Sequence, residues 1–104
     1  MPIGVDKKGK TIIIYLQRER ALNATNLHML RIMNEVLDNA LNDGFDNIVI
    51  TSRYEKFFCA GGDIKEVYEF IANNRIKEAQ EFFNYEYDFI EKIAKFPIPI
   101  ITLV

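Results

Sequence analysis

Two runs of β-branched and apolar residues constrain the fold more than any other feature: Ile48-Val49-Ile50-Thr51 and Ile100-Ile101-Thr102-Leu103-Val104. A continuous apolar run of the second kind is typical of a strand buried on both faces, as in a parallel sheet covered by helices. Segments with helical spacing lie between the runs, so the order of elements predicts an α/β fold with right-handed crossovers. In such folds, ligands collect at the carboxyl ends of strands.

Two extended segments precede these runs. Residues 3–5 and 11–17 are separated by Asp6-Lys7-Lys8-Gly9-Lys10, whose glycine and charges suit a hairpin turn. We expect the pair to form one edge of the sheet.

Three helices are expected between the strands. The first has Thr25 as its expected N-cap, ends near Asn42-Asp43-Gly44, and carries an apolar face of Leu27, Leu30, Met33, Leu37, Ala40 and Leu41. The second begins at about Asp63 and repeats apolar residues at helical spacing: Ile64, Val67, Tyr68 and Ile71. Asn73-Asn74 interrupts the pattern before a longer helix, at about residues 75–95.

The segment most suited to chemistry is Cys59-Ala60-Gly61-Gly62-Asp63, which joins the strand at 48–51 to the second helix. The glycines allow a ligand to approach the peptide closely. Asp63 and Glu66 match an acidic capping box, so the N–H groups of Gly61, Gly62 and the first turn should converge at a partly positive helix end. Such a place stabilises a carboxylate, a phosphate or an oxyanion. A double glycine before a helix is also common in a plain tight turn, and spacing alone leaves both interpretations open.

Composition excludes several classes of function. The 104 residues are 49% hydrophobic, which requires a packed core, and the net charge of −2 argues against nucleic acid or an acidic membrane as the main partner. No apolar run approaches the roughly 20 residues that span a bilayer, and no secretory signal begins the chain. The single cysteine fits a reducing compartment. We therefore expect a cytoplasmic protein that binds neither nucleic acid nor membrane.

The final apolar run ends the chain at Val104, whereas a buried strand is normally followed by a loop and a covering element. The expectation is that residues 1–104 are the N-terminal part of a single domain, truncated within a strand.

Two motifs, Arg20-Ala21-Leu22-Asn23-Ala24 and Phe58-Cys59-Ala60-Gly61-Gly62-Asp63-Ile64, resemble those of the enoyl-CoA hydratase/isomerase family, the crotonase superfamily. The likeness covers almost the whole chain. It implies the N-terminal portion of a crotonase-like fold of ββα repeats, which binds acyl-CoA thioesters.

The resemblance also implies roles for residues. Enzymes of that family polarise the thioester carbonyl with two backbone N–H groups, and Gly62 corresponds in position to the first donor. Residues similar to those lining the coenzyme A channel are Ala21, Leu22, Ala60, Gly61, Gly62, Asp63 and Ile64. The second donor and the catalytic carboxylates of the family come after the strand that begins at Ile100.

Glu86 lies in the apolar face of the third helix, one turn from Phe82 and from Ile90. A carboxylate there would be desolvated unless a cation or several donors compensate. The alternative is a helix edge that leaves Glu86 in water, and periodicity does not decide between them. The segment Phe82-Phe83-Asn84-Tyr85-Glu86-Tyr87 is similar to the 3-hydroxyisobutyryl-CoA hydrolase branch, in which a glutamate here contacts the acyl group.

The remaining polar residues carry weaker expectations. His28 is assigned no role, Cys59 is expected to be a small buried packing residue, and Arg20 and Lys65 could meet the phosphates of coenzyme A or simply be solvated. No metal site is expected, and no cofactor beyond the coenzyme A of the substrate.

The expected function is thioester hydrolysis of the 3-hydroxyisobutyryl-CoA hydrolase kind. The alternatives are an enoyl-CoA hydratase or isomerase and a non-catalytic acyl-CoA-binding module. By resemblance, the 104 residues alone would be inactive, and the longer enzyme would be a homo-oligomer, a trimer or hexamer in that family.

Overall fold

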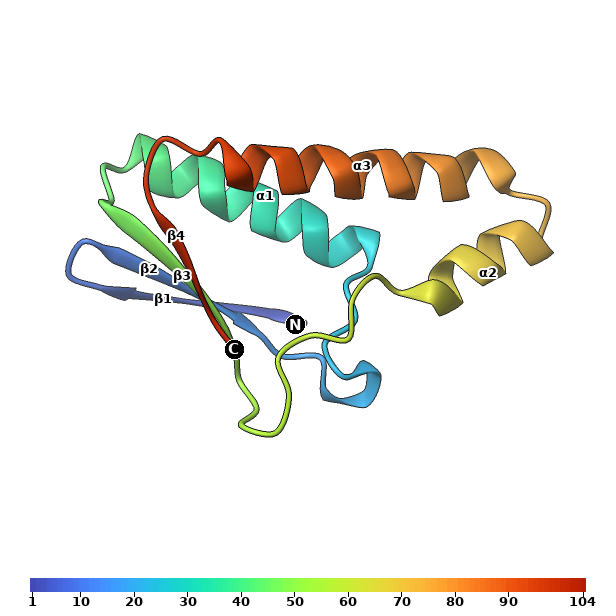
Figure 1. The fold of residues 1–104 in the computed structure, drawn as a ribbon, viewed down its shortest axis with the longest axis horizontal. Coiled ribbons are helices and arrows are strands. Elements are labelled where there is room, and N and C mark those ends of the chain that lie inside the picture. Colours follow the sequence, from blue (N-terminus) through green and yellow to red (C-terminus); the bar gives the residue numbers. More distant parts are fainter.

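The computed structural model describes residues 1–104 as a four-stranded mixed sheet with helices packed on one of its faces (Figure 1). The strands lie in the order β1-β2-β3-β4, and their bounds are Ile3–Lys8, Thr11–Leu16, Asn47–Ser52 and Ile100–Leu103. β1 and β2 are antiparallel, whereas β2, β3 and β4 are parallel to one another. The predicted α/β class is confirmed.

The expected hairpin is present, and its strands reach closer to the turn than predicted. Lys8 pairs with Thr11, so Gly9 and Lys10 alone make the turn. Gly9 has φ +61°, a left-handed conformation that glycine adopts without the steric cost other residues meet. β1 forms one edge of the sheet, as expected.

The connecting segments contain one short 3-10 helix and three α-helices. Their bounds are Glu19–Ala21 for η1, Leu27–Asn42 for α1, Ile64–Ala72 for α2 and Ile76–Ala94 for α3. Helix α1 has Asn26 as its N-cap, with the Asn26 side chain accepting from the Met29 N–H at 2.8 Å. The prediction of Thr25 as the cap is wrong, because the backbone of Thr25 pairs instead with the glycine loop.

Helix α1 supplies much of the core. Its buried residues are Met29, Leu30, Met33, Leu37 and Ala40, which pack against alternate side chains of β2 and β3. Leu41, predicted to belong to this face, is 38% exposed. Helix α3 runs beside α1 and contributes Phe89 to the same core (Figure 1).

β4 is not buried on both faces, which corrects the prediction from its continuous apolar run, and β2 and β3 are buried on one face alone. Along β2, only Ile12, Ile14 and Leu16 are buried, because the helices of these 104 residues cover one face of the sheet. β4 is an edge strand in which Ile101 and Leu103 are about half exposed. The helices of these residues therefore leave part of the apolar surface of the strands exposed.

Helices α2 and α3 are separated at Asn73-Asn74 as predicted, with Asn74 at φ +58°. The apolar spacing of α2 is helical, yet none of its residues is buried. In α3 the buried residues are Ala79, Phe82 and Phe89, while the apolar side chains of Ile76, Phe83 and Ile90 are about half exposed. None of the helices is both long and apolar enough to cross a membrane.

Candidate functional site

The two motifs singled out in the sequence lie against each other. The Ala60 N–H donates to the Leu22 carbonyl at 3.0 Å, and the Thr25 N–H donates to the Gly61 carbonyl at 2.8 Å. The Asp63 N–H returns a bond to the Thr25 carbonyl at 2.9 Å. These bonds join the turn of residues 18–25 and the loop of residues 59–63 like a short parallel ladder, which fixes one backbone relative to the other.

Asn23 anchors this junction from inside. Its side chain is fully buried and its backbone is left-handed, a conformation that Asn tolerates better than most residues. Its Oδ1 accepts from the Arg18 N–H at 2.7 Å, and its Nδ2 donates to Ser52 Oγ and to the Phe58 carbonyl, both at 2.8 Å. Asn23 thereby ties the turn to the end of β3 and to the glycine loop.

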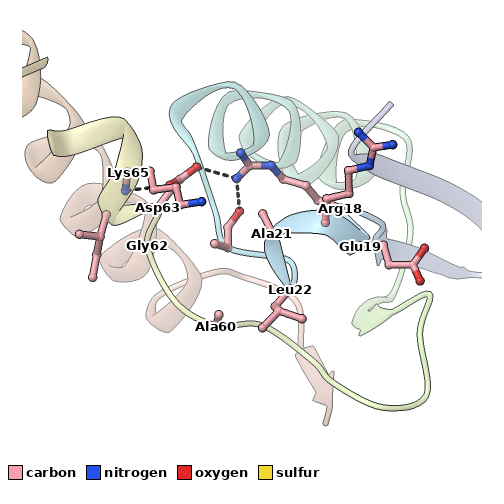
Figure 2. A pocket seen from close by; sticks show the side chains of 11 residues that line it. Arg18, Glu19, Ala21, Leu22, Ala60, Gly62, Asp63 and Lys65 are labelled. Atoms are coloured by element: carbon pink, nitrogen blue, oxygen red, sulfur yellow. Dashed lines mark hydrogen bonds and ion pairs between the residues drawn. The ribbon is translucent and has the colours of Figure 1, made fainter. Parts of the chain in front are cut away.

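A half-buried ion pair closes the junction from the other side (Figure 2). Arg18 Nη1 donates to Asp63 Oδ2 at 2.7 Å and to the Ala24 carbonyl at 2.8 Å. The Asp63 carboxylate is therefore held by the first turn of α2 and by a residue 45 positions away. Arg18 was not among the residues singled out from the sequence.

Asp63 is the N-cap of α2, as predicted, but the reciprocal capping box is not formed. Asp63 Oδ1 accepts from the N–H groups of Lys65 and Glu66, at 3.1 and 3.3 Å. Glu66 does not return a bond to Asp63. Its Oε1 accepts from the Leu27 N–H at 3.2 Å, because the Asp63 N–H is already bonded to Thr25.

The N–H groups of Gly61 and Gly62 differ in their hydrogen bonding. The Gly61 N–H lies 3.3 Å from Cys59 Sγ and Gly61 has φ +103°, so the predicted convergence of both glycine N–H groups is wrong for Gly61. The Gly62 N–H has no hydrogen-bond partner in the chain. It is a free donor of this loop and lies two residues before the start of α2.

An open groove of about 920 Å³ runs along the junction. It brings together six of the residues predicted to bind substrate: Ala21, Leu22, Ala60, Gly62, Asp63 and Ile64 (Figure 2). Arg18, Glu19, Arg20 and Lys65 also line it, so cations outnumber carboxylates along its walls.

A second cavity, of about 290 Å³, lies behind the loop. Its wall contains Gly61, Gly62 and Glu86, the other predicted site residues, and its floor is apolar: Leu16, Leu30, Met33, Ile50 and Phe89. Gly62 borders both spaces. Every predicted site residue therefore lies on one of two spaces that meet at Gly62.

Glu86 projects from α3 toward the glycine loop. A β-carbon built on Gly62 would lie 2.9 Å from Glu86 Oε2, so the carboxylate rests against the Gly62 backbone. Glu86 is half-buried, so its carboxylate is neither fully desolvated nor fully in water, the two alternatives that periodicity left open. No cation lies within ion-pairing distance of it in the chain.

Two other candidates are placed as follows. Cys59 is half-buried and its thiol donates to the Asn23 carbonyl at 3.1 Å, which makes it part of the loop scaffold. His28 is exposed on α1 and lines neither space. No group of three or more His, Cys, Asp or Glu side chains is arranged to hold a metal ion.

Comparison with known proteins identifies relatives of the chain. Residues 11–104 match the family model described as enoyl-CoA hydratase/isomerase. A mitochondrial 3-hydroxyisobutyryl-CoA hydrolase from Dictyostelium discoideum is 34% identical over 94% of the chain and 28% of its own length. A short-chain-enoyl-CoA hydratase from Clostridium acetobutylicum is 36% identical over 62% of the chain and 25% of its own length.

The fold has equally clear relatives. The crystal structure of an enoyl-CoA hydratase from Rhodobacter sphaeroides superimposes with a TM-score of 0.90 at 30% identity, over 98% of this chain and 31% of that one. The chain belongs to the enoyl-CoA hydratase/isomerase family, the crotonase superfamily. It spans about a quarter of the length of the curated relatives it matches.

Proposed function

We propose that these residues form part of an acyl-CoA thioesterase, most like 3-hydroxyisobutyryl-CoA hydrolase, in which the Gly62 N–H stabilises the oxyanion. The observation that carries the proposal is the unpaired Gly62 N–H at the meeting point of a long groove and an apolar cavity. A thioester with its acyl group in the cavity and its coenzyme A in the groove would present its carbonyl at that point.

The chemistry follows from the position of the donor. When water adds to the thioester carbon, the carbonyl oxygen becomes an anion, and a fixed N–H stabilises that anion more than the neutral carbonyl. Collapse of the intermediate then breaks the carbon–sulfur bond and releases the carboxylic acid and the coenzyme A thiol. The nearby N-terminus of α2 adds a partial positive charge to the same place.

The groove suits a long, anionic ligand. Arg20 and Lys65 lie along its walls and offer cations to phosphate groups, while Ala21, Leu22 and Ala60 line it with small or apolar side chains. Such a groove can bind an adenine-containing chain without many dedicated polar side chains.

The acyl cavity favours a short acyl group with a hydroxyl. Its floor is apolar, and Glu86 is the carboxylate in its wall, so Glu86 can accept a hydrogen bond from a hydroxyl or from the attacking water. Enoyl-CoA hydration is the second candidate, supported by the Clostridium relative and the Rhodobacter structure. There the same N–H would stabilise an enolate.

Assays on the longest polypeptide that carries these residues separate the candidates. Hydrolysis of 3-hydroxyisobutyryl-CoA releases a thiol, whereas hydration of crotonyl-CoA consumes the enoyl chromophore without thiol release. Gly62→Pro removes the donor and should abolish either reaction. Glu86→Ala should lower hydrolysis, with Glu81→Ala, an exposed carboxylate on the same helix, as the matched control. Full activity in Gly62→Pro would refute the oxyanion proposal.

The 104 residues by themselves are expected to bind acyl-CoA without turnover, as a non-catalytic module would. Appreciable thioester hydrolysis by the purified chain would contradict this. We further propose a homo-oligomer and a location in the cytoplasm. Light scattering tests the first, and cell fractionation with a mitochondrial marker tests the second, since the Dictyostelium relative is named as mitochondrial.

A further inference from the structure

We propose that Arg18 is a positioning residue, which holds the Gly62 donor in its reactive place by fixing Asp63. This inference rests on the proposed function and adds to it a residue that does not itself touch the reacting atoms. Arg18 reaches the glycine loop from the turn of residues 18–25, across 45 positions of sequence.

The geometry gives Arg18 control over both backbones of the junction. Its Nη1 bonds to Asp63 Oδ2 at 2.7 Å and to the Ala24 carbonyl at 2.8 Å, so one nitrogen ties the loop to the turn. Its own backbone N–H is bonded to the buried Asn23 side chain. The guanidinium therefore acts from a fixed point.

Asp63 transmits this control to Gly62, its immediate neighbour in the chain. The Asp63 N–H is bonded to Thr25, and Asp63 Oδ1 caps α2. Both the direction of the Gly62–Asp63 peptide and the start of the helix therefore depend on where Asp63 is held. The Gly62 N–H belongs to the Gly61–Gly62 peptide, whose carbonyl accepts from the Thr25 N–H. Because Asp63 is also bonded to Thr25 and is joined directly to Gly62, a shift of Asp63 would displace that peptide and its N–H.

Burial explains why a charged partner is needed. The Asp63 side chain is only 10% exposed and that of Arg18 is 29% exposed, so the carboxylate has little water to solvate it. Without Arg18 the carboxylate would have to turn toward the groove or lose its cap, because an unpaired charge at low exposure is unfavourable. Either movement disturbs the loop that carries Gly62.

A purely structural role for the pair predicts something different. If the ion pair only supports the fold, its loss would lower thermal stability and the amount of active protein, while the remaining folded molecules would turn over normally. A positioning role predicts that folded protein binds substrate but turns it over slowly. The two roles separate in kcat measured per folded molecule.

The kinetic test compares five variants in the longest polypeptide that carries these residues, with 3-hydroxyisobutyryl-CoA as substrate. Arg18→Met should lower kcat at least tenfold with little change in KM, and Arg18→Lys should recover part of the loss. Arg31→Met, the loss of an arginine exposed on α1 and outside both spaces, should leave kcat unchanged. In the Asp63→Asn background, where the cap oxygen remains but the charge is gone, Arg18→Met should have a much smaller effect.

A second readout is independent of activity. In the 104-residue chain, the amide resonance of Gly62 should move in Arg18→Met and return toward its original position in Arg18→Lys. If Arg18→Met does not fold, Arg18→Lys and Asp63→Asn are compared in the same way. An unmoved Gly62 amide, or a normal kcat in folded Arg18→Met, would overturn the positioning role. Lack of thioester activity in the unmodified protein, with a moved amide, would instead refute the proposed function and leave the coupling intact.

Discussion

The Glu86 carboxylate lies against the backbone of Gly62, so closely that a methyl group on Gly62 would come within 2.9 Å of Glu86 Oε2. One residue thus offers an unpaired N–H, and the other offers a carboxylate directly beside it. A donor for an anion and an acceptor for a proton or hydroxyl are placed at one point by elements 24 residues apart in sequence, the loop and α3.

This contact predicts the effect of Gly62→Ala. The alanine keeps its N–H, and the atom it meets is the end of a flexible side chain, so the fold should survive while Glu86 is displaced. We expect thioester hydrolysis to fall at least tenfold with the melting temperature nearly unchanged. Kinetics and thermal denaturation measure the two effects.

Gly61→Ala is the matched control, and here we expect the alanine to lower the stability of the fold. No atom lies near its β-carbon, but Gly61 has φ +103°, so alanine there should cost about 1–3 kcal/mol of the free energy of unfolding. Urea denaturation measures this cost. Equal loss of stability in the two alanine variants would contradict the placement of the loop.

Asn23→Ala should be strongly destabilising. The substitution removes one acceptor and two donor bonds from a fully buried site, and it leaves the Arg18 N–H and the Phe58 carbonyl without their partner. A loss of at least about 2 kcal/mol in the free energy of unfolding is expected. Asn39→Ala, on the exposed side of α1, should change it little; a similar loss in both variants would contradict the anchoring role.

Lys92→Met should loosen the contact between α1 and α3. Lys92 Nζ reaches Asn34 Oδ1 at 2.6 Å and Asp38 Oδ1 at 2.5 Å, which makes it a bridge between helices. Because the site is only partly buried, we expect a cost of up to about 1 kcal/mol, reduced by high salt. Lys95→Met, whose pair with Glu91 stays within α3, should cost less in the same denaturation experiment.

The start of α3 should respond weakly to acid. The hydrogen bond from Arg75 lowers the pKa of Glu78 below its ordinary value of 4.5, and the same bond raises the pKa of Arg75. A carboxylate whose pKa is lowered by folding stabilises the native state above its unfolded pKa, and this contribution disappears as pH falls through the folded pKa. Below that pH, protonated Glu78 resembles glutamine.

Melting temperatures of the unmodified chain and of Glu78→Gln should therefore differ slightly at neutral pH and converge well below pH 4.5. Both side chains are about half exposed to solvent, so salt should reduce the difference at neutral pH. A difference that grows on acidification would show that another group carries the effect.

Local sequence signals predicted most of the elements. The hairpin, the strand before the glycines, the break at Asn73-Asn74 and the third helix follow from turn residues and apolar spacing, which act within a few positions. The N-cap of α1 was harder to predict, because Asn26 and Thr25 are both good N-cap residues. Thr25 pairs with the distant glycine loop, which leaves Asn26 as the residue that caps α1.

Contacts between distant residues could not be predicted from spacing. Arg18 meets Asp63 only because the two motifs are folded together, and Asn23 is buried only because the end of β3 and the loop close over it. The expectation that the strand at residues 100–104 is buried on both faces failed for a related reason. Apolarity indicates that a face can be covered, while coverage depends on which elements are present.

The central claim is that the Gly62 N–H binds the thioester oxygen, and replacing that amide by an ester tests it most directly. Cys59 is the single cysteine, so a synthetic segment of residues 59–104 can be ligated to residues 1–58 with an ester at the Gly62 nitrogen. The readout is the infrared carbonyl frequency of a bound, carbon-13-labelled acyl-CoA, which a hydrogen bond lowers. An ester at the Gly61 nitrogen, whose N–H faces Cys59 Sγ, is the matched control.

We predict that the carbonyl frequency is lowered on binding to the unmodified chain and to the Gly61 ester, and that it returns toward the value of free ligand in the Gly62 ester. A frequency that stays low in the Gly62 ester would contradict the assignment of Gly62 as the oxyanion donor.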